Sequence, residues 1–362
     1  MAEQGTLTYN PHDRELAARL QTALGLVDAS HGVRAVRPMA DTGLAHHHLW
    51  LSRDDRDWVA RIPKQSQLGL AAQANLDYQA ACFSRASASG HTPALHAILP
   101  PSNELPRGAL LVDAIHGRPA RLPDDLPAIA EALTAIHSIA VPPADRRPPL
   151  QAPDSPWLGM HQELKQQARW LASAGLAPAV RQGIESELSS LPKRLPIESS
   201  RLISFDAHPG NFLITEAGQA ILVDLEKCRY GLPGFDLAHA TLYTSTTWDL
   251  SSHTVLEVDD IVRFYRHLHA NAGNEPNDNN LMAILLTCRR AMWLWSLTWC
   301  AMWRARNGEP QDASTRGEDW STELSDQTLV AHVRDRVEHY LSPAIIDLVR
   351  TELHVLEDRL LA

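Results

Sequence analysis

The sequence predicts an α+β protein with two lobes, a small one built on a β-sheet and a larger one built mainly from helices. Short apolar segments of strand length crowd the first 115 residues, whereas longer amphipathic segments fill the chain after Gly117. A chain of 362 residues is long enough for two hydrophobic cores. We therefore predict a first domain at residues 1–115 and a second at residues 116–362.

The first lobe is expected to begin with a helix and to continue mainly as strands. Residues 12–25 repeat apolar side chains at helical spacing and end at a glycine. Five short apolar segments predict strands, at residues 33–38, 47–52, 58–62, 94–99 and 109–115. The polar turn at residues 53–57 joins two of them as a hairpin, and the Ala-rich residues 68–89 predict a helix against the sheet.

The second lobe is expected to be mainly helical, because its apolar residues recur at a period near 3.6. The predicted helices cover residues 126–138, 158–174, 178–191, 258–270, 280–306, 327–340 and 343–361. Helices of the same character flank the Pro-rich residues 141–153, so we interpret this segment as a surface connection within the lobe.

Composition excludes several classes of function. The formal net charge of −10 argues against a nucleic-acid-binding surface and fits a neutral or cationic small substrate. No apolar run reaches 18 residues, so we expect a cytoplasmic protein without a membrane span. The four cysteines are widely spaced, which predicts reduced thiols rather than disulfides or a zinc site.

The segment from Ser204 to Asn211 carries the strongest chemical signal. Asp206 precedes Asn211 by five residues, and Asp224 ends the short apolar run that begins at Ile221. Phosphoryl transfer needs one carboxylate near the acceptor hydroxyl and oxygen ligands that hold Mg²⁺ against the phosphates. A tight loop would place Asp206 and Asn211 together, and the apolar strand would bring Asp224 beneath them. The spacing therefore predicts a kinase-type site.

Three motifs resemble those of the aminoglycoside phosphotransferase and choline kinase family, which has a protein-kinase-like fold. They are Asp206-Ala-His-Pro-Gly-Asn211, Val223-Asp224-Leu-Glu226 and Gly231-Leu-Pro-Gly-Phe-Asp236-Leu-Ala238. Residues 133–137 and 111–117 match less specifically, and the resemblance covers roughly residues 30–300. It implies a small antiparallel-sheet lobe that binds nucleotide and a larger helical lobe that carries catalysis and acceptor binding.

The resemblance implies a role for each motif residue, with ATP and Mg²⁺ as cofactors. Asp206 would be the catalytic base. Asn211 and Asp224 would be Mg²⁺ ligands, and Glu226 would be a further ligand or lie just outside the ligand shell. Asp236 would brace the catalytic loop by hydrogen bonds, and His208 would hold its shape.

In the small lobe, the resemblance places nucleotide contacts at two strands and the hinge. Thr42-Gly43-Leu44 looks like the turn that covers the phosphates, where glycine lets backbone N–H groups approach closely. Arg61 takes the place of the lysine that binds the α- and β-phosphates. The hinge segment, with Asp113 and Ile115, would hold adenine through its backbone.

The sequence departs from the family pattern at three positions. Ser204 and Phe205 stand where the family usually has His-Gly, and Gln79 stands where a glutamate usually pairs with the strand cation. Asp77 or Glu104 would have to supply that negative charge instead. These departures leave open a weakly active or non-catalytic pseudokinase.

Tryptophans and histidines each allow two interpretations. Trp295, Trp299 and Trp303 recur every four residues on one helix face. This stripe is either core packing or a wall of the acceptor pocket, where indole faces would attract a cationic amine. The run His46–His48 suggests a metal site, but alternating strand side chains do not converge on one ion.

We therefore expect a kinase that moves the γ-phosphate of ATP to a hydroxyl of a small polar or cationic molecule. A choline- or ethanolamine-like amino alcohol is favoured over an aminoglycoside, a sugar or thiamine. A binuclear metallophosphoesterase is suggested only by Asp206-Ala-His208, because no later Gly-Asp or Gly-Asn-His supplies the other ligands. The sequence makes no prediction of oligomeric state.

Overall fold

The computed structural model describes residues 11–27, 31–39, 45–250, 252–271, 279–306 and 327–362. These residues fall into two compact units. The small unit comprises the described residues before Ala81, those from Pro93 to Ala114, and residues 327–329. The large unit comprises the others, so the chain enters it at Ala81 and, for the second time, at Ile115.

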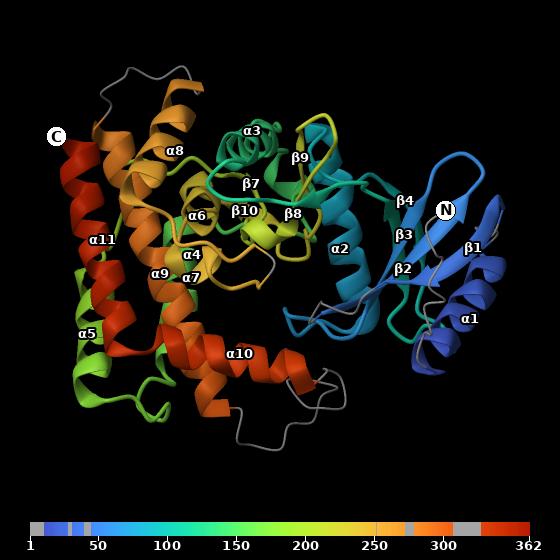
Figure 1. Ribbon diagram of the computed structural model, residues 1–362, viewed down its shortest axis with the longest axis horizontal. Helices are drawn as coiled ribbons and strands as arrows, with labels where there is room; N and C mark the ends of the chain where they lie inside the picture. Colours follow the sequence, from blue (N-terminus) through green and yellow to red (C-terminus); the bar gives the residue numbers. More distant parts are fainter. Residues whose placement is uncertain (1–10, 28–30, 40–44, 251, 272–278, 307–326) are drawn as a thin grey trace, which may run out of the picture. The chain divides into compact units, whose positions relative to one another are not determined.

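The small unit is built on a five-stranded antiparallel sheet with the strand order β1-β2-β3-β5-β4 (Figure 1). The strands are β1 (Val33–Pro38), β2 (His46–Arg53), β3 (Trp58–Pro63), β4 (Leu95–Leu99) and β5 (Ala109–Asp113). Helix α1 (Pro11–Leu26) packs on the sheet through Leu16, Leu20 and Leu24, which share one core with Leu49 and Leu51. The helix presents these leucines at spacings of four residues, so they form one apolar face.

Helix α2 (Ala72–Ala86) starts four residues later than the sequence predicts, and the 3₁₀ turn η1 (Ser87–Ser89) follows it. Ser66 explains the late start: its carbonyl oxygen accepts a hydrogen bond from the Gly69 N–H at 3.1 Å, and its hydroxyl accepts one from the Leu70 N–H at 3.0 Å. Gly69 has φ +67°, a left-handed conformation that a helix does not allow. Residues 68–71 therefore form a turn.

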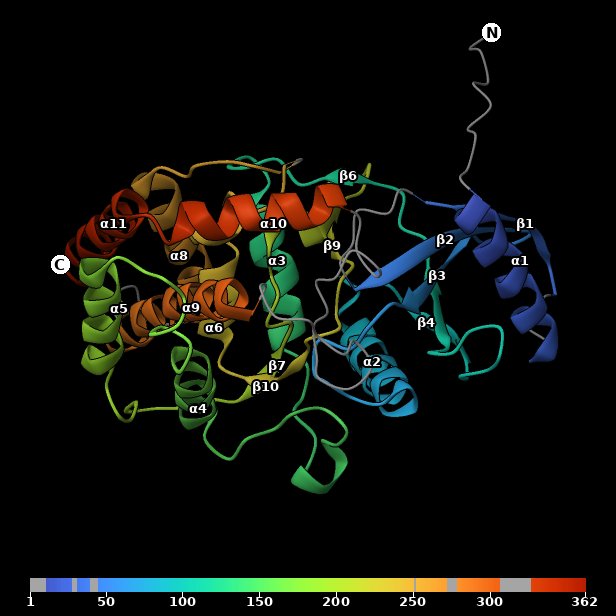
Figure 2. The same ribbon diagram turned by 90° about the horizontal axis from the view of Figure 1, so that it is seen from below.

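The large unit is mainly helical. Its longer helices are α3 (Leu126–His137), α4 (Pro156–Ala168), α5 (Pro178–Ser190), α8 (Val258–Asn271), α9 (Asn279–Arg306), α10 (Gln327–Tyr340) and α11 (Pro343–Leu361). Helix α9 contacts α4, α5 and α11, and it runs beside α11 in Figure 1. Figure 2 shows α4, α5 and α11 around it from a second direction.

The motif residues of the large unit lie on short elements that the sequence analysis largely missed. Strands β6 (Arg118–Pro119), β8 (Phe212–Ile214) and β9 (Ala220–Leu222) form one sheet, and β7 (Arg201–Ile203) pairs with β10 (Arg229–Gly231). Helices α6 (Pro233–His239) and α7 (Tyr243–Thr246) follow, and the 3₁₀ turns η2 (Ala144–Arg146) and η3 (Pro209–Asn211) complete the set.

Two further features bear on the chemistry of the chain. Among the helices in the described ranges, none combines the length and the hydrophobicity that crossing a membrane requires. All four cysteines, which lie within the described ranges, are buried and form no disulfide, so they act as small core side chains rather than as crosslinks.

Candidate active site

Asp206 lies in the loop between β7 and β8, directly after a residue with an unusual backbone conformation. Phe205 has φ +58°, the left-handed region that a side chain with a Cβ atom avoids. This conformation costs about 1–3 kcal/mol, so the surrounding structure has to hold it in place. The loop turns sharply at Phe205, and Asp206 follows the turn with a partly exposed side chain.

The carboxylate of Asp236 braces this turn. Its Oδ2 accepts hydrogen bonds from Ser204 N at 2.8 Å and from His137 Nε2 at 3.0 Å. Its Oδ1 accepts hydrogen bonds from Phe205 N at 2.8 Å and from Ser204 Oγ at 3.1 Å. Asp236 is fully buried at the start of α6, so four donors satisfy a carboxylate that has no water around it.

Ser204 and Phe205, two of the three departures from the family pattern, each have a clear local role. The Ser204 hydroxyl donates to Asp236 and accepts a hydrogen bond from Asp206 N at 3.1 Å, so it joins the brace to the next residue of the loop. The backbone at position 205 is left-handed, a conformation that glycine adopts without steric cost, which explains why glycine suits this position in the family pattern. Phe205 takes up that conformation without being a glycine.

The ring of Phe205 packs against Arg229 and Trp295, and this packing stabilises the loop. The Arg229 guanidinium carbon lies 3.7 Å from the centre of the ring, and the Trp295 ring meets it edge-on at 5.5 Å. Glu163 accepts hydrogen bonds from Arg229 and, at 3.1 Å, from Trp295 Nε1. A cavity of about 40 Å³ borders the ring, Glu163 and Arg229, and is far smaller than a ligand pocket.

The hairpin of β8 and β9 brings Asn211 and Asp224 together. Phe212 pairs with Leu222, and Val223 N donates to Asn211 O at 2.9 Å. Asn211 also donates from Nδ2 to the Asp206 carbonyl at 2.9 Å, which leaves its Oδ1 as the atom that suits a cation. The loop and the segment after β9 are thus connected by backbone and side-chain hydrogen bonds.

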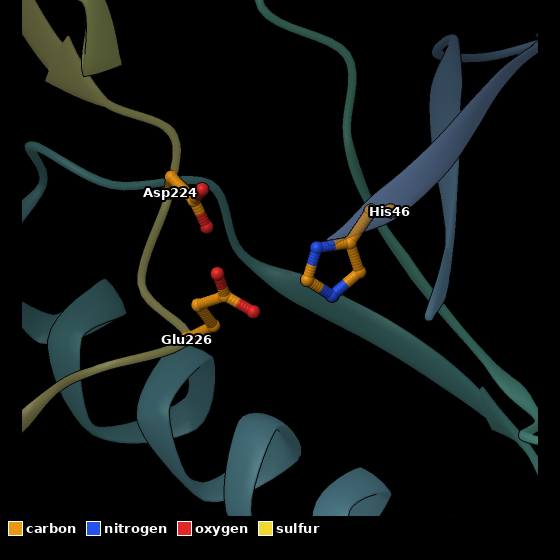
Figure 3. A group of neighbouring side chains, drawn as sticks. All are labelled: His46, Asp224 and Glu226. Carbon is orange, nitrogen blue, oxygen red and sulfur yellow. The ribbon is translucent and has the colours of Figure 1, made fainter. Parts of the chain in front are cut away.

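Asp224 and Glu226 point to the same side of the segment after β9, as Figure 3 shows. Oxygens of the two carboxylates lie within 4.8 Å of each other. Carboxylate and amide oxygens are the ligands that Mg²⁺ prefers. Asn211, Asp224 and Glu226 therefore fit a Mg²⁺ site by their chemistry. Figure 3 also shows His46, which is the first residue of β2 in the small unit.

Lys227 is a residue of the site that the sequence analysis missed. Its Nζ lies 3.0 Å from Asp206 Oδ2, and His239 Nδ1 lies 3.6 Å from Asp206 Oδ1. Burial alone would raise the pKa of the Asp206 carboxyl, but the Lys227 ammonium holds that pKa below its ordinary value. Lys227 directly follows Glu226 in the sequence, but it is not part of the motif that ends at Glu226. A basic residue beside three candidate oxygen ligands is the sequence feature that could have indicated it.

His208, for which the resemblance implies a supporting role, contacts the backbone of the loop. Its Nδ1 accepts a hydrogen bond from Gly210 N at 2.9 Å. A Cβ atom on Gly210 would lie 2.7 Å from His208 Cε1, so only glycine leaves room for this contact. Burial lowers the pKa of His208 to about 4, and the imidazole is therefore neutral at physiological pH.

The small unit carries the residues predicted to bind nucleotide. Thr42, Gly43 and Leu44 lie outside the described residues. Arg61 is buried in the middle of β3, and its Nη1 lies 3.2 Å from His48 Nε2 on β2. The side-chain oxygen of Gln79 lies 2.9 Å from His46 Nε2.

The hinge residue Asp113 uses its side chain within the small unit. Its carboxylate accepts hydrogen bonds from Ala94 N at 2.9 Å, His96 Nε2 at 2.8 Å and Arg56 Nη1 at 3.2 Å. Burial opposes ionisation, yet these donors keep the pKa of Asp113 below its ordinary value. The carboxylate thus joins β5 to β4 and to the turn between β2 and β3, and Ile115 follows as the first residue of the large unit in that segment.

The tryptophan stripe of α9 divides between the loop and the core. Trp295 contacts Phe205, as described above, and Trp303 is buried. Trp299 meets Trp248 edge-on at 5.8 Å. Trp295 and Trp299 remain partly exposed, so two of the three indoles have surface available for a ligand.

A model of the phosphotransferase enzyme family matches residues 40–257, which is more than half of the chain. The chain belongs to this family. The resemblance seen in the motifs is thereby confirmed, and the protein is a small-molecule phosphotransferase of this family. A search of curated proteins found no match to the sequence.

Several solved structures share the fold of this chain at low sequence identity. The ethanolamine kinase from Plasmodium vivax is 10% identical with a TM-score of 0.58, and the match covers 97% of this chain and 94% of that one. The macrolide 2′-phosphotransferase MphH from Brachybacterium faecium is 15% identical with a TM-score of 0.54, covering 90% and 98%. The choline kinase LicA from Streptococcus pneumoniae, in complex with AMP, is 13% identical with a TM-score of 0.51, covering 92% and 100%. These likenesses confirm the predicted α+β, protein-kinase-like fold.

Proposed function

We propose that the protein transfers the γ-phosphate of ATP to a hydroxyl group of a small polar or cationic molecule. The observation that carries this proposal is the braced loop at Asp206. Asp236 holds the turn before Asp206 with three hydrogen bonds from Ser204 and Phe205, and the turn leaves the Asp206 carboxylate partly exposed and ionised. A fixed, accessible carboxylate is what aligning an acceptor hydroxyl requires.

In this proposal Asp206 is the catalytic base and accepts the proton of the acceptor hydroxyl. Asn211, Asp224 and Glu226 would hold Mg²⁺, which neutralises phosphate charge when it is bound. The hydrogen bonds from Val223 N to Asn211 O and from Asn211 Nδ2 to Asp206 O support this proposal, since they connect Asn211 with the loop of Asp206 and with the segment of Asp224. His208 and Asp236 keep the loop in shape and take no part in proton transfer.

Nucleotide binding is proposed for the small unit and the hinge. Arg61 would bind the α- and β-phosphates, Thr42-Gly43-Leu44 would cover them, and the backbone of Asp113 and Ile115 would hold adenine. The side chain of Asp113 supports a backbone role, because its carboxylate is already engaged by three donors. A relative of the same fold was solved with AMP, which fits a nucleotide donor.

For the acceptor we propose an amino alcohol of the choline or ethanolamine type. The support is the partly exposed indole surface of Trp295 and Trp299, which would attract a cationic amine, with buried Trp303 beneath it. Relatives of this fold include a macrolide 2′-phosphotransferase as well as choline and ethanolamine kinases. The fold therefore does not determine the acceptor, and a test of the acceptor has to include all these classes of compound.

The direct test is ATP turnover across a panel of choline, ethanolamine, aminoglycosides, macrolides, sugars and thiamine. We expect Mg²⁺-dependent turnover on one class and a loss of about 10³-fold or more in Asp206→Asn, since the base is removed without a change of size. Asp358→Asn, at an exposed position of α11, is the matched control and should keep full activity.

Two outcomes would contradict the proposal. Equal turnover by the wild type and Asp206→Asn would show that Asp206 is not the base. Nucleotide binding without turnover on any acceptor would favour the pseudokinase alternative, which Gln79 motivates because it faces His46 and supplies no carboxylate.

A further inference from the structure

None of the roles proposed above uses Lys227, yet it makes the closest described ion pair of Asp206. The two side-chain atoms lie 3.0 Å apart, and each side chain keeps 18% of its surface exposed, so a ligand can reach both. We propose, resting on the function proposed above, that Lys227 is a further catalytic residue that bridges Asp206 and the phosphoryl group during its transfer.

The position of Lys227 supports this role. It follows Glu226 directly and lies three residues after Asp224, on a turn that Cys228 N closes by donating to Leu225 O at 3.0 Å. The ammonium group nevertheless reaches across to the loop of Asp206. Lys227 therefore connects the segment that carries the candidate Mg²⁺ ligands with the loop that carries the base.

The electrostatics of the reaction require a cation at this place. A carboxylate and the phosphoryl oxygens repel each other, and an acceptor hydroxyl between them brings both to within a few ångströms. Among the described basic neighbours of Asp206, Lys227 lies closest, with its Nζ at 3.0 Å from the carboxylate, whereas His239 Nδ1 lies at 3.6 Å. Lys227 supplies the positive charge.

An ammonium group has three donor hydrogens, so Lys227 can keep one on Asp206 and direct another at a phosphoryl oxygen. In the transfer step, the bond from the γ-phosphorus to the bridging oxygen of ATP breaks. A bond to the acceptor oxygen forms, the hydroxyl proton passes to Asp206, and ADP leaves. Lys227 stays protonated throughout and offsets charge on the transferred group.

The experiment compares Lys227→Met, which removes the charge, with Lys227→Arg, which keeps it. Lys165→Met, at an exposed position of α4, is the matched control. Thermal unfolding is measured with Mg²⁺–ADP alone and with Mg²⁺–ADP plus aluminium fluoride, whose planar form imitates a phosphoryl group in transfer. Binding to the folded state raises the unfolding temperature, so the added shift reports contacts to the phosphoryl mimic.

We expect Mg²⁺–ADP to stabilise all variants equally, and the added aluminium fluoride shift to be lost in Lys227→Met and retained in Lys227→Arg and Lys165→Met. In turnover, with the acceptor found by the panel or with water, Lys227→Met should lose about 10²-fold in kcat with little change in KM for ATP. A residue that only neutralises Asp206 would leave the aluminium fluoride shift intact.

An unchanged aluminium fluoride shift in Lys227→Met overturns this inference while leaving the proposed function standing. Absence of any Mg²⁺–ADP shift in the wild type overturns the proposed function, and the inference with it. If Lys227→Met does not fold, Asp206→Asn/Lys227→Met removes both charges of the pair. The aluminium fluoride shift of this double variant is then compared with that of Asp206→Asn, and equal shifts overturn the inference.

Discussion

Replacing Asp236 with asparagine should break hydrogen bonds that hold the loop of Asp206. The amide keeps one acceptor oxygen and presents an NH₂ group to the other pair of donors. Two of the four hydrogen bonds to Asp236, either those from Ser204 N and His137 or those from Phe205 N and Ser204 Oγ, are then replaced by donor–donor contacts. Each lost bond to a buried charged acceptor is worth roughly 1.5–3 kcal/mol, so Asp236→Asn should destabilise the protein by about 3–6 kcal/mol.

This loss is a large fraction of the 5–15 kcal/mol that stabilises a typical domain. Urea unfolding of the wild type, Asp236→Asn and the exposed control Asp358→Asn measures it. Activity should fall even where the variant is folded, because Phe205 can leave its left-handed conformation once the brace is weakened. A change in unfolding free energy below about 1 kcal/mol, with kcat intact, would refute the reasoning.

Three further predictions concern other parts of the large unit. Gly210→Ala should lower the free energy of unfolding by about 1–3 kcal/mol and kcat by at least about 10-fold, because the new Cβ would lie 2.7 Å from His208 Cε1. Gly25→Ala is the control, since its Cβ would have no atom within 4 Å. Equal effects of the two substitutions would contradict the prediction. The folded pKa of His208, about 4, lies below its ordinary 6.5, so its contribution to stability is complete above pH 6.5 and is lost as pH falls toward 4. As pH falls from 6.5 toward 4, the free energy of unfolding measured in urea should drop by roughly 3 kcal/mol less in His208→Gln than in the wild type. Parallel pH profiles of the two proteins would contradict this prediction. Arg289→Met should destabilise the protein by about 3–5 kcal/mol in the same assay, because the buried guanidinium donates to Glu352 at 2.7 Å and its removal takes this donor from the carboxylate. Adding Glu352→Gln should restore stability, and failure to do so would show another cause.

The long elements could be predicted from the sequence because their signals are local. Strand β1 occupies residues 33–38, the range predicted from its short apolar segment, and helices α5 and α11 lie within a residue or two of their predicted ends. Each of these segments contains enough periods of its own pattern to be recognised without its neighbours.

The short elements around the site could not be predicted in the same way. Strand β7 has three residues, and it exists because Ile203 pairs with Arg229 on β10, far away in the sequence. No three-residue segment carries a periodic signal, so its structure depends on tertiary hydrogen bonds. The same limit applies to Lys227: its identity is visible in the sequence, but the direction of its side chain toward Asp206 depends on the turn at Cys228.

The departure at Ser204 shows what residue types alone leave undetermined. A missing family histidine suggested a weakened loop, whereas the Ser204 hydroxyl contacts both Asp236 and Asp206 N. His137, from the distant helix α3, supplies an imidazole donor to the same carboxylate. The loss of one organiser is thus offset by side chains whose partnership only the folded chain reveals.

Phe205 has a consequence for how this protein can evolve. Glycine at this position would recover about 1–2 kcal/mol of backbone strain, but removing the buried ring would cost about 3–5 kcal/mol and enlarge the cavity beside it. The single step back to the family residue is therefore uphill, although both end states are workable. Changes at Trp295 and Arg229, which flank the ring, decide whether that step is tolerated. The residue that position 205 can accept therefore depends on the side chains packed around it.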